Sequence, residues 1–242
     1  MKLSEEMKNK TLLSFELFPP KTEKGLQNLP GTIDHLMKYN PSYISCTYGA
    51  GGGNVGANRE VCQMIKNAGT TPVTHFTVIK NTKEGIKEQL DQYLADGVDH
   101  MLALRGDIPL GETTTCGDFD YATDLVKFVR DTYGDKFEIA VAGSPEGHIS
   151  CRSLESDIAV LKQKQDNGAD YIMTQLCWDM EQFKYWLDAI RKAGITMPVD
   201  VGVMPILDQA ATINMALSRN GCVMDRELSR MISRHWLFPN PF

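Results

Sequence analysis

The 242-residue chain carries a formal net charge of −6, with 42% hydrophobic and 23% charged residues, as expected of a globular domain with a sizeable core. The acidic balance and the lack of a Lys/Arg cluster argue against a nucleic-acid or anionic-membrane surface. No apolar run approaches the roughly 20 residues that span a bilayer, and we expect no signal peptide. The six cysteines form no C-x-x-C pair, so we expect reduced thiols, no structural metal and a cytoplasmic location.

Short runs typical of strands alternate with longer amphipathic segments along the chain. The expected strands are 12–17, 43–48, 73–79, 100–104, 137–142, 171–176 and 199–203. The expected helices include 82–97, 121–133, 154–168, 180–194, 208–219 and 225–235. This alternation predicts a single α/β domain over residues 1–242 with parallel strands. A TIM (β/α)8 barrel and an open doubly wound sheet share the pattern, so periodicity does not choose between them.

Polar side chains interrupt the apolar pattern near the C-terminal ends of five expected strands. They are Glu16, Thr47, His75, the neighbours Arg105 and Asp107, and Gln175. Successive side chains on a strand point to opposite faces, so Glu16 is expected to point into a barrel mouth while its apolar neighbours pack on helices. A ring of contributing strands favours a barrel, because a doubly wound sheet binds ligands at one switch point. Each residue alone also has a purely structural interpretation.

A glycine-rich stretch, GAGGGNVG at 49–56, follows the second expected strand. Gly51, Gly53 and Gly56 match the G-x-G-x-x-G pattern of dinucleotide-binding turns. Such a site also needs an acidic residue at the end of the next strand, and that strand ends at Lys80 without one. The match is therefore weak, and the glycines equally suit a loop whose backbone approaches a ligand closely.

The strings LSFELFPPKTEKG, YISCTYGAGG, HMLALRGDIP, DYATDLV, SPEGH and YIMTQLCWD have an order and spacing that resemble methylenetetrahydrofolate reductases, from Leu12 to Pro205. The resemblance implies a TIM barrel that holds FAD noncovalently at the C-terminal ends of its strands. It implies reduction of 5,10-methylenetetrahydrofolate to 5-methyltetrahydrofolate, with FAD reduced by NAD(P)H or by another donor through a partner subunit. It also implies a cytoplasmic homo-oligomer.

The resemblance also implies roles for individual residues. Glu16 matches the general acid, Asp107 the carboxylate beside flavin and folate, and Gln175 a folate-contacting amide. The positions that match FAD contacts are Thr47, His75, Arg105, Gly106, Asp107, Tyr121, Ala122, His148, Asp157 and Lys164. Two positions depart from the family pattern. Gln209 falls near a substrate or nicotinamide position that is often aromatic, and Ser144 stands where some bacterial members have an aromatic residue beside the flavin.

The implied reaction needs a proton on folate N10, so that the imidazolidine ring opens to an iminium ion before hydride transfer. A free glutamate has a pKa of about 4.3 and is ionised at pH 7, but burial raises that value. An inward Glu16 suits this acid role. Arg105 and Lys164 suit the FAD diphosphate by charge, and Gln175 offers both a donor and an acceptor to a pterin edge.

Two other function classes stay open. One is a noncatalytic flavin- or folate-binding barrel subunit of a larger electron-transfer complex. The other is an unrelated barrel lyase or aldolase, although the expected strands place no Schiff-base lysine inward. Nothing after Val203 alternates like a strand, so we also expect the eighth strand and helix to be missing. Such a C-terminally shortened form would expose apolar surface and associate.

Overall fold

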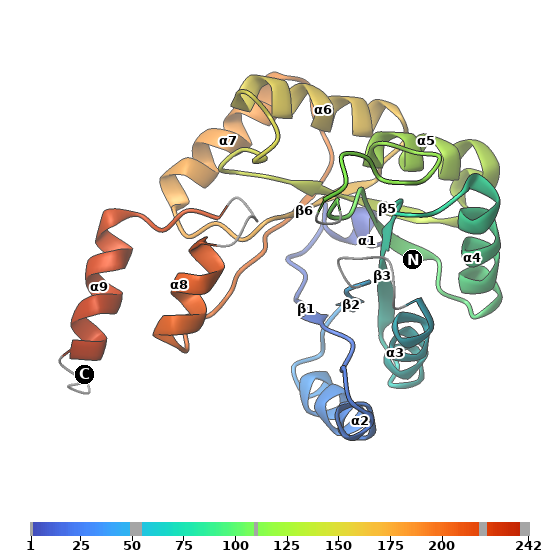
Figure 1. The fold of residues 1–242 in the computed structure, drawn as a ribbon, viewed down its shortest axis with the longest axis horizontal. Helices are drawn as coiled ribbons and strands as arrows, with labels where there is room; N and C mark the ends of the chain where they lie inside the picture. The colour runs from blue at the N-terminus through green and yellow to red at the C-terminus, as the bar shows by residue number, and fades with distance from the viewer. Residues whose placement is uncertain (1, 49–54, 109–110, 218–221, 238–242) are drawn as a thin grey trace. The chain divides into compact units, whose positions relative to one another are not determined.

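The computed structural model describes residues 2–48, 55–108, 111–217 and 222–237. Within them lie the strands β1 (Ser14–Leu17), β2 (Tyr43–Cys46), β3 (Thr71–Thr77), β4 (His100–Leu104), β5 (Glu138–Gly143), β6 (Tyr171–Thr174) and β7 (Val199–Asp200). The helices are α1 (Leu3–Glu6), α2 (Glu23–Met37), α3 (Val55–Asn67), α4 (Lys83–Ala95), α5 (Ala122–Tyr133), α6 (Leu154–Asp166), α7 (Met180–Lys192), α8 (Gln209–Leu217) and α9 (Arg226–Leu237). A short 3-10 helix, η1 (Gly134–Lys136), follows α5 (Figure 1).

The strand order settles which α/β class this is. Hydrogen-bonded neighbours follow the chain order from β1 to β7. The adjacent strands from β1 to β5, and the pair β6 and β7, all run parallel. A doubly wound sheet reverses its order at a switch point, whereas the strands of a (β/α) barrel are sequential. The fold is therefore of the barrel class, and the described residues after Asp200 form α8 and α9 but no eighth strand.

The chain divides into two compact units. The first unit comprises residues 1–141 and 164–171, and the second comprises residues 142–163 and 172–242. Among the described residues, no helix is both long and apolar enough to cross a membrane.

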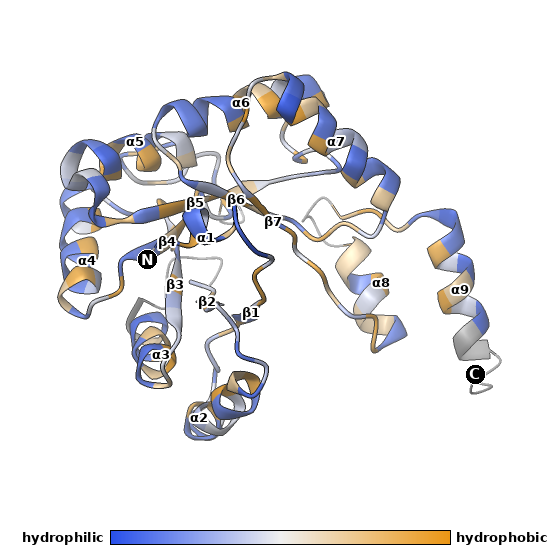
Figure 2. Cartoon of the chain, turned by 180° about the vertical axis from the view of Figure 1, so that it is seen from behind, coloured by the Kyte–Doolittle hydropathy of each residue, from blue (hydrophilic) through white to orange (hydrophobic). Residues whose placement is uncertain are grey.

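The core of the first unit lies between its strands and the helices that follow them. Helix α3 packs against β2 and β3 (Figure 1). Helix α5 packs against β4. In α5 the buried residues Leu125, Val126, Val129 and Tyr133 recur at helical spacing. Figure 2 shows the same mixture of hydrophobic and hydrophilic residues on α4 and α6. Each large apolar side chain buried in this way stabilises the fold by about 1.5–3 kcal/mol.

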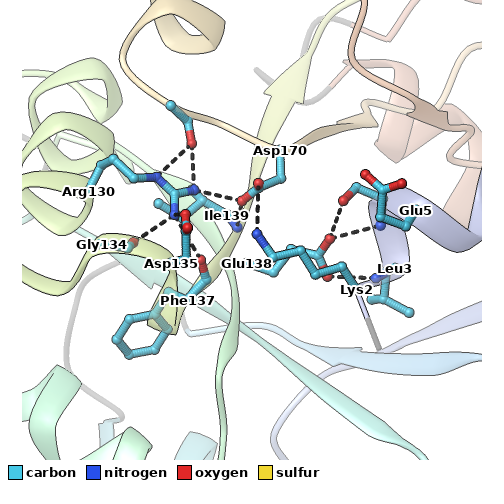
Figure 3. Close-up of polar contacts among 12 residues, drawn as sticks. Lys2, Leu3, Glu5, Arg130, Gly134, Asp135, Phe137, Glu138, Ile139 and Asp170 are labelled. Atoms are coloured by element: carbon cyan, nitrogen blue, oxygen red, sulfur yellow. Dashed lines mark hydrogen bonds and ion pairs between the residues drawn. The ribbon is translucent and has the colours of Figure 1, made fainter.

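The N-terminal helix α1 docks at the start of β5, an element that the polar N-terminal sequence does not predict. The carboxylate of Glu138 accepts the backbone N–H of Leu3 at 2.7 Å and that of Ser4 at 2.8 Å, and also the Ser4 hydroxyl (Figure 3). The Glu138 residue is 3% exposed, and His100 of β4 lies beside it. The first helical N–H groups are normally unpaired, so this buried carboxylate acts as their cap.

A second polar cluster, also drawn in Figure 3, fixes the end of α5 in the same unit. The Arg130 guanidinium lies 2.7 Å from the Asp170 carboxylate and donates to the carbonyl oxygens of Gly168 and Gly134. Asp170 in turn accepts the backbone N–H of Ile139 at 2.8 Å. These contacts tie the C-terminal end of α5 to β5 and to the turn before β6.

The second unit explains why β7 is shorter than the expected strand 199–203. The N–H of Gly202 donates to the Thr174 hydroxyl at 3.0 Å instead of to a backbone carbonyl. A Cβ at Gly202 would lie 2.5 Å from the Thr174 carbonyl oxygen, so a residue without a side chain is needed beside the end of β6. Beyond β7, Val203, Leu207 and Leu217 are largely exposed. The expectation of exposed apolar surface there is confirmed within the described residues.

Candidate active site

Two predicted site residues meet at the C-terminal ends of strands in the first unit. Glu16 lies on β1 and His75 on β3, and Oε2 of Glu16 is 3.6 Å from Nε2 of His75. The His75 side chain is buried, whereas that of Glu16 is 47% exposed. Parallel strands bring their C-terminal ends to one side, where barrel enzymes place their chemistry.

Burial shifts the pKa values of the two groups in opposite directions. Partial burial raises the pKa of the Glu16 carboxyl above its ordinary value, because the charged form loses hydration. Burial lowers the pKa of His75 to about 4, because here the protonated form is the charged one. At neutral pH the imidazole is therefore uncharged. A neutral neighbour leaves the raised pKa of Glu16 in place, as a general acid requires.

Thr47 follows β2 directly and is anchored by a residue that the sequence interpretation missed. The side-chain amide of Asn58, on α3, donates to the carbonyl oxygens of Cys46 at 3.0 Å and Thr47 at 3.1 Å. Its amide oxygen accepts the hydroxyls of Thr74 at 2.8 Å and Tyr93 at 2.7 Å. One buried amide thus fixes the end of β2.

The helical spacing of apolar residues on α3 could have identified Asn58 from the sequence. Asn58 is fully buried and shares a helical face with the buried residues Val61, Cys62 and Ile65, three, four and seven positions further on. A polar side chain on an apolar face needs hydrogen-bond partners. The glycine-rich stretch just before α3 cannot be assessed in the same way, because its residues 49–54 lie outside the described residues.

Arg105, Gly106 and Asp107 follow β4, as expected. Gly106 has a φ of +86°, and a Cβ there would lie 2.6 Å from Cγ1 of Ile79 and 3.0 Å from Cβ of Thr77. The Nε of Arg105 donates to the Gly106 carbonyl oxygen at 3.2 Å. Only glycine fits this left-handed and crowded position without strain.

The same surface has the features of a cofactor cradle. The Thr77 hydroxyl is buried and has no hydrogen-bond partner in the described part of the chain. Buried polar atoms nearly always have a partner, so this hydroxyl is available to a ligand. Beside it the Gly106 backbone carries no side chain to block close approach. A noncovalently held planar cofactor with polar edges fits this combination.

Two further predicted cofactor residues of the first unit begin α5. Tyr121 is the N-cap of α5, and its N–H donates to the Asp124 carboxylate at 3.0 Å. Its side chain is 61% exposed, and Ala122 is the first residue of the helix. Lys164 lies in the last turn of α6. The aromatic ring of Tyr121 is thus the part of this N-cap that is accessible to a ligand.

In the second unit, Gln175 follows β6 directly, as predicted. Its N–H donates to the Gly143 carbonyl oxygen at 2.8 Å, and its side-chain Oε1 accepts the N–H of Leu176 at 3.0 Å. The backbone N–H of His148 donates to the Asp157 carboxylate at 3.2 Å, which brings these two predicted residues together. Ser144 begins the loop that holds His148, and Gln209 is the first residue of α8.

Comparison with known proteins gives the family. The model of the family described as methylenetetrahydrofolate reductase matches residues 2–228. Methylenetetrahydrofolate reductase (NADH) 1 of Arabidopsis thaliana is 38% identical over 219 residues, which cover 85% of this chain and 37% of the relative. The 5,10-methylenetetrahydrofolate reductase of Escherichia coli is 34% identical over 202 residues, covering 83% of this chain and 67% of the relative.

A solved structure supports the fold alone. Phosphoenolpyruvate phosphomutase from Streptomyces platensis subsp. rosaceus aligns with a TM-score of 0.58 at 12% sequence identity, covering 97% of this chain and 83% of that one. The chain spans just over a third of the length of the plant relative and two thirds of the bacterial one. With a family match over residues 2–228, the chain belongs to the methylenetetrahydrofolate reductase family.

Proposed function

We propose that this chain catalyses the flavin-dependent reduction of 5,10-methylenetetrahydrofolate to 5-methyltetrahydrofolate. The carboxyl of Glu16 carries the proposal. It lies at the C-terminal end of β1, its pKa is raised by burial, and its neighbour His75 is neutral at physiological pH. Opening of the folate imidazolidine ring needs a proton at N10, and a carboxyl whose pKa is raised by burial supplies it more readily than a free glutamate does.

The cofactor proposed for this site is FAD, which supplies the hydride when bound. By the family resemblance, the residues assigned to it are Thr47, His75, Arg105, Gly106, Asp107, Tyr121, Ala122, His148, Asp157 and Lys164. The guanidinium of Arg105 and the ammonium of Lys164 suit a diphosphate, since charge-assisted hydrogen bonds are the stronger ones. The open backbone at Gly106 and the unpartnered hydroxyl of Thr77 support close binding of the cofactor.

Asp107 and two glutamines complete the proposed folate chemistry. The carboxylate of Asp107 stabilises the cationic iminium form of the folate, because opposite charges attract strongly away from bulk water. The amide of Gln175 offers both a donor and an acceptor to the pterin edge. Gln209 is assigned to the substrate or the nicotinamide by its place in the family pattern.

The proposed electron donor is NADH or NADPH. The name of the Arabidopsis relative specifies NADH, which supports this choice for the present chain. A donor that acts through a partner subunit is the competing possibility, and it is tested by the same experiment. We further propose that the protein forms a homo-oligomer.

Anaerobic spectroscopy of the purified, flavin-loaded protein tests the function. The yellow protein should bleach when NADH or NADPH is added, and its colour should return when 5,10-methylenetetrahydrofolate follows. A panel of donors, with and without candidate partner subunits, identifies the physiological reductant. A protein that binds flavin and folate but never transfers electrons would contradict the proposal and favour a noncatalytic subunit. A protein that flavin cannot reconstitute would exclude both.

A further inference from the structure

The contact between Glu16 and His75 joins alternate strands of the sheet. β1 and β3 are separated by β2, and the registers place Glu16 level with Ser45 and Ser45 level with Val73. His75 is two residues after Val73 on β3, so their side chains point to the same face of the sheet. In a (β/α) barrel, alternate strands supply the side chains of one interior layer. The two side chains therefore meet across β2 inside the barrel.

The Nε2 atom of His75 lacks a hydrogen-bond partner. It is buried, and no partner exists for it in the described part of the chain. The Glu16 carboxyl oxygen is 3.6 Å away, beyond the usual limit of about 3.2 Å. Because the Glu16 side chain is 47% exposed, a small rotation can bring the carboxyl into range. Since buried polar atoms are normally paired, the carboxyl is the group placed to complete this contact.

We propose that Nε2 of His75 accepts a hydrogen bond from the protonated carboxyl of Glu16, which makes His75 a positioning residue for the general acid. This inference rests on the acid role proposed for Glu16. A neutral imidazole with its proton on Nδ1 presents a lone pair on Nε2, and a protonated carboxyl presents one O–H. The bond holds the acid proton in one orientation until folate N10 takes it.

The groups around the contact keep that proton on Glu16. Burial holds the pKa of His75 at about 4, so the imidazole does not remove the proton at neutral pH. Cys46 on β2, the strand between the two, interacts electrostatically with Glu16. Its hydrogen bond with Cys62 and its burial raise the pKa of the Cys46 thiol, which stays neutral. These neighbours thus add no charge that would ionise Glu16.

The other neutral tautomer of His75 would have the opposite effect on the protonation of Glu16. With its proton on Nε2, the ring would donate to an ionised Glu16 and favour the carboxylate. That arrangement would oppose the role of Glu16 as an acid. The two possibilities differ in which ring nitrogen carries the proton, and nitrogen chemical shifts distinguish them directly.

The decisive measurement is a long-range ¹H–¹⁵N correlation spectrum of the protein labelled at its histidine nitrogens. The His75 signals are identified by their loss in His75→Gln. At pH 7 we expect a neutral ring with no proton on Nε2. The Nε2 shift should change when the Glu16 carboxyl ionises as pH is raised, and should no longer do so in Glu16→Ala. A proton on Nε2, or an imidazolium at pH 7, would overturn the proposal.

A double-mutant cycle on single-turnover folate reduction adds a kinetic test. His75→Leu should slow this step about tenfold, as expected for one lost hydrogen bond, and His75→Gln should restore most of the rate through its amide oxygen. In a Glu16→Gln background, with both variants saturated with flavin, the His75→Leu change should slow this step no further. Equal slowing in both backgrounds would overturn the proposal. If the wild-type protein reduces no folate but Nε2 of His75 carries no proton, the proposed function is contradicted, whereas the proposed hydrogen bond between Glu16 and His75 is not.

Discussion

Nε2 of His100 lies 3.0 Å from Oε2 of Glu138, at the start of adjacent strands β4 and β5. Burial opposes the charged form of His100, but the carboxylates of Asp99 and Glu138 outweigh it and raise its pKa to about 9. Burial would likewise raise the pKa of Glu138, yet the His100 imidazolium and the hydrogen bonds from Ser4 and Leu3 lower it to about 2. The pair is therefore an imidazolium–carboxylate pair across the neutral range.

Stability should fall on the alkaline side because of this pair. A raised folded-state pKa contributes stability that is complete below the unfolded value of about 6.5 and is lost as pH rises through about 9. We expect the free energy of unfolding to drop by roughly 3 kcal/mol between pH 7 and 10, measured by urea denaturation. His100→Gln should abolish this component of the pH dependence, whereas His35→Gln, on the exposed end of α2, should retain it.

Glu138→Gln should destabilise the first unit at neutral pH. The substitution leaves the buried His100 imidazolium with Asp99 as its remaining carboxylate partner, at a cost of up to about 3 kcal/mol. The backbone N–H groups of Leu3 and Ser4 also lose a charged acceptor, so their hydrogen exchange should accelerate. Glu88→Gln, on the exposed part of α4, is the matched control. Equal stability of the two variants would mean that the Glu138 carboxylate does not hold α1.

Glu16→Gln should separate the two halves of the proposed reaction. The amide cannot protonate folate N10, so we expect single-turnover folate reduction to slow by about 10²–10⁴-fold. Reduction of the bound flavin by the donor needs no such proton and should stay near the wild-type rate. Stopped-flow absorbance follows both steps. Near-normal folate reduction in this variant would remove Glu16 from the acid role.

Asp107→Asn should make the bound flavin easier to reduce. A negative charge beside the flavin disfavours the extra charge of the reduced form, so its removal should raise the midpoint potential. An anaerobic redox titration measures this shift. Asp131→Asn, on the exposed surface of α5 and paired with Lys127, changes the net charge equally and should leave the potential unaltered. A potential that stays the same or falls in Asp107→Asn contradicts the assignment.

Gly106→Ala should weaken flavin binding and lower stability. The added Cβ would lie 2.6 Å from Ile79 at a φ of +86°, so strain and steric overlap combine to cost about 1–3 kcal/mol. Gly111→Ala is a useful control, because Gly111 has a φ of +90° with nothing within 4 Å of its Cβ position. The difference between the two variants, in thermal unfolding and in flavin titration, isolates the crowding. Equal effects of the two substitutions would mean that the side chains around Gly106 move to accommodate the added Cβ.

The sequence predicted the regular elements where local pattern determines them. Strand 100–104 agrees with β4 at both ends, since an apolar run is bounded there by Asp99 and Arg105. The strand expected at 73–79 corresponds to β3, which ends at Thr77. Beyond it, the backbone N–H groups of Val78 and Lys80 donate to the carbonyl oxygens of Arg105 and Thr115, which lie in loops. Such partners are distant in the chain, and periodicity carries no information about them.

The sequence predicted that the candidate residues lie near strand ends, but it did not predict their contacts. Alternation on β1 predicted that Glu16 would point inward, and its 3.6 Å approach to His75 agrees. The neutrality of His75 follows from burial by side chains of several elements, which no local pattern specifies. Helix α1 went unpredicted for a similar reason: its docking depends on Glu138, 135 residues beyond Leu3.

The sequential strand order has a consequence for biosynthesis. In each adjacent pair, the strand that emerges later from the ribosome pairs with the one made just before it. No strand from β1 to β7 has to await a distant partner, and only one helical connection separates most pairs. Loop-closure entropy is thus spread over several successive steps, which favours vectorial folding in chain order. β3, seven residues long and almost wholly buried, can order as soon as β2 and α3 precede it.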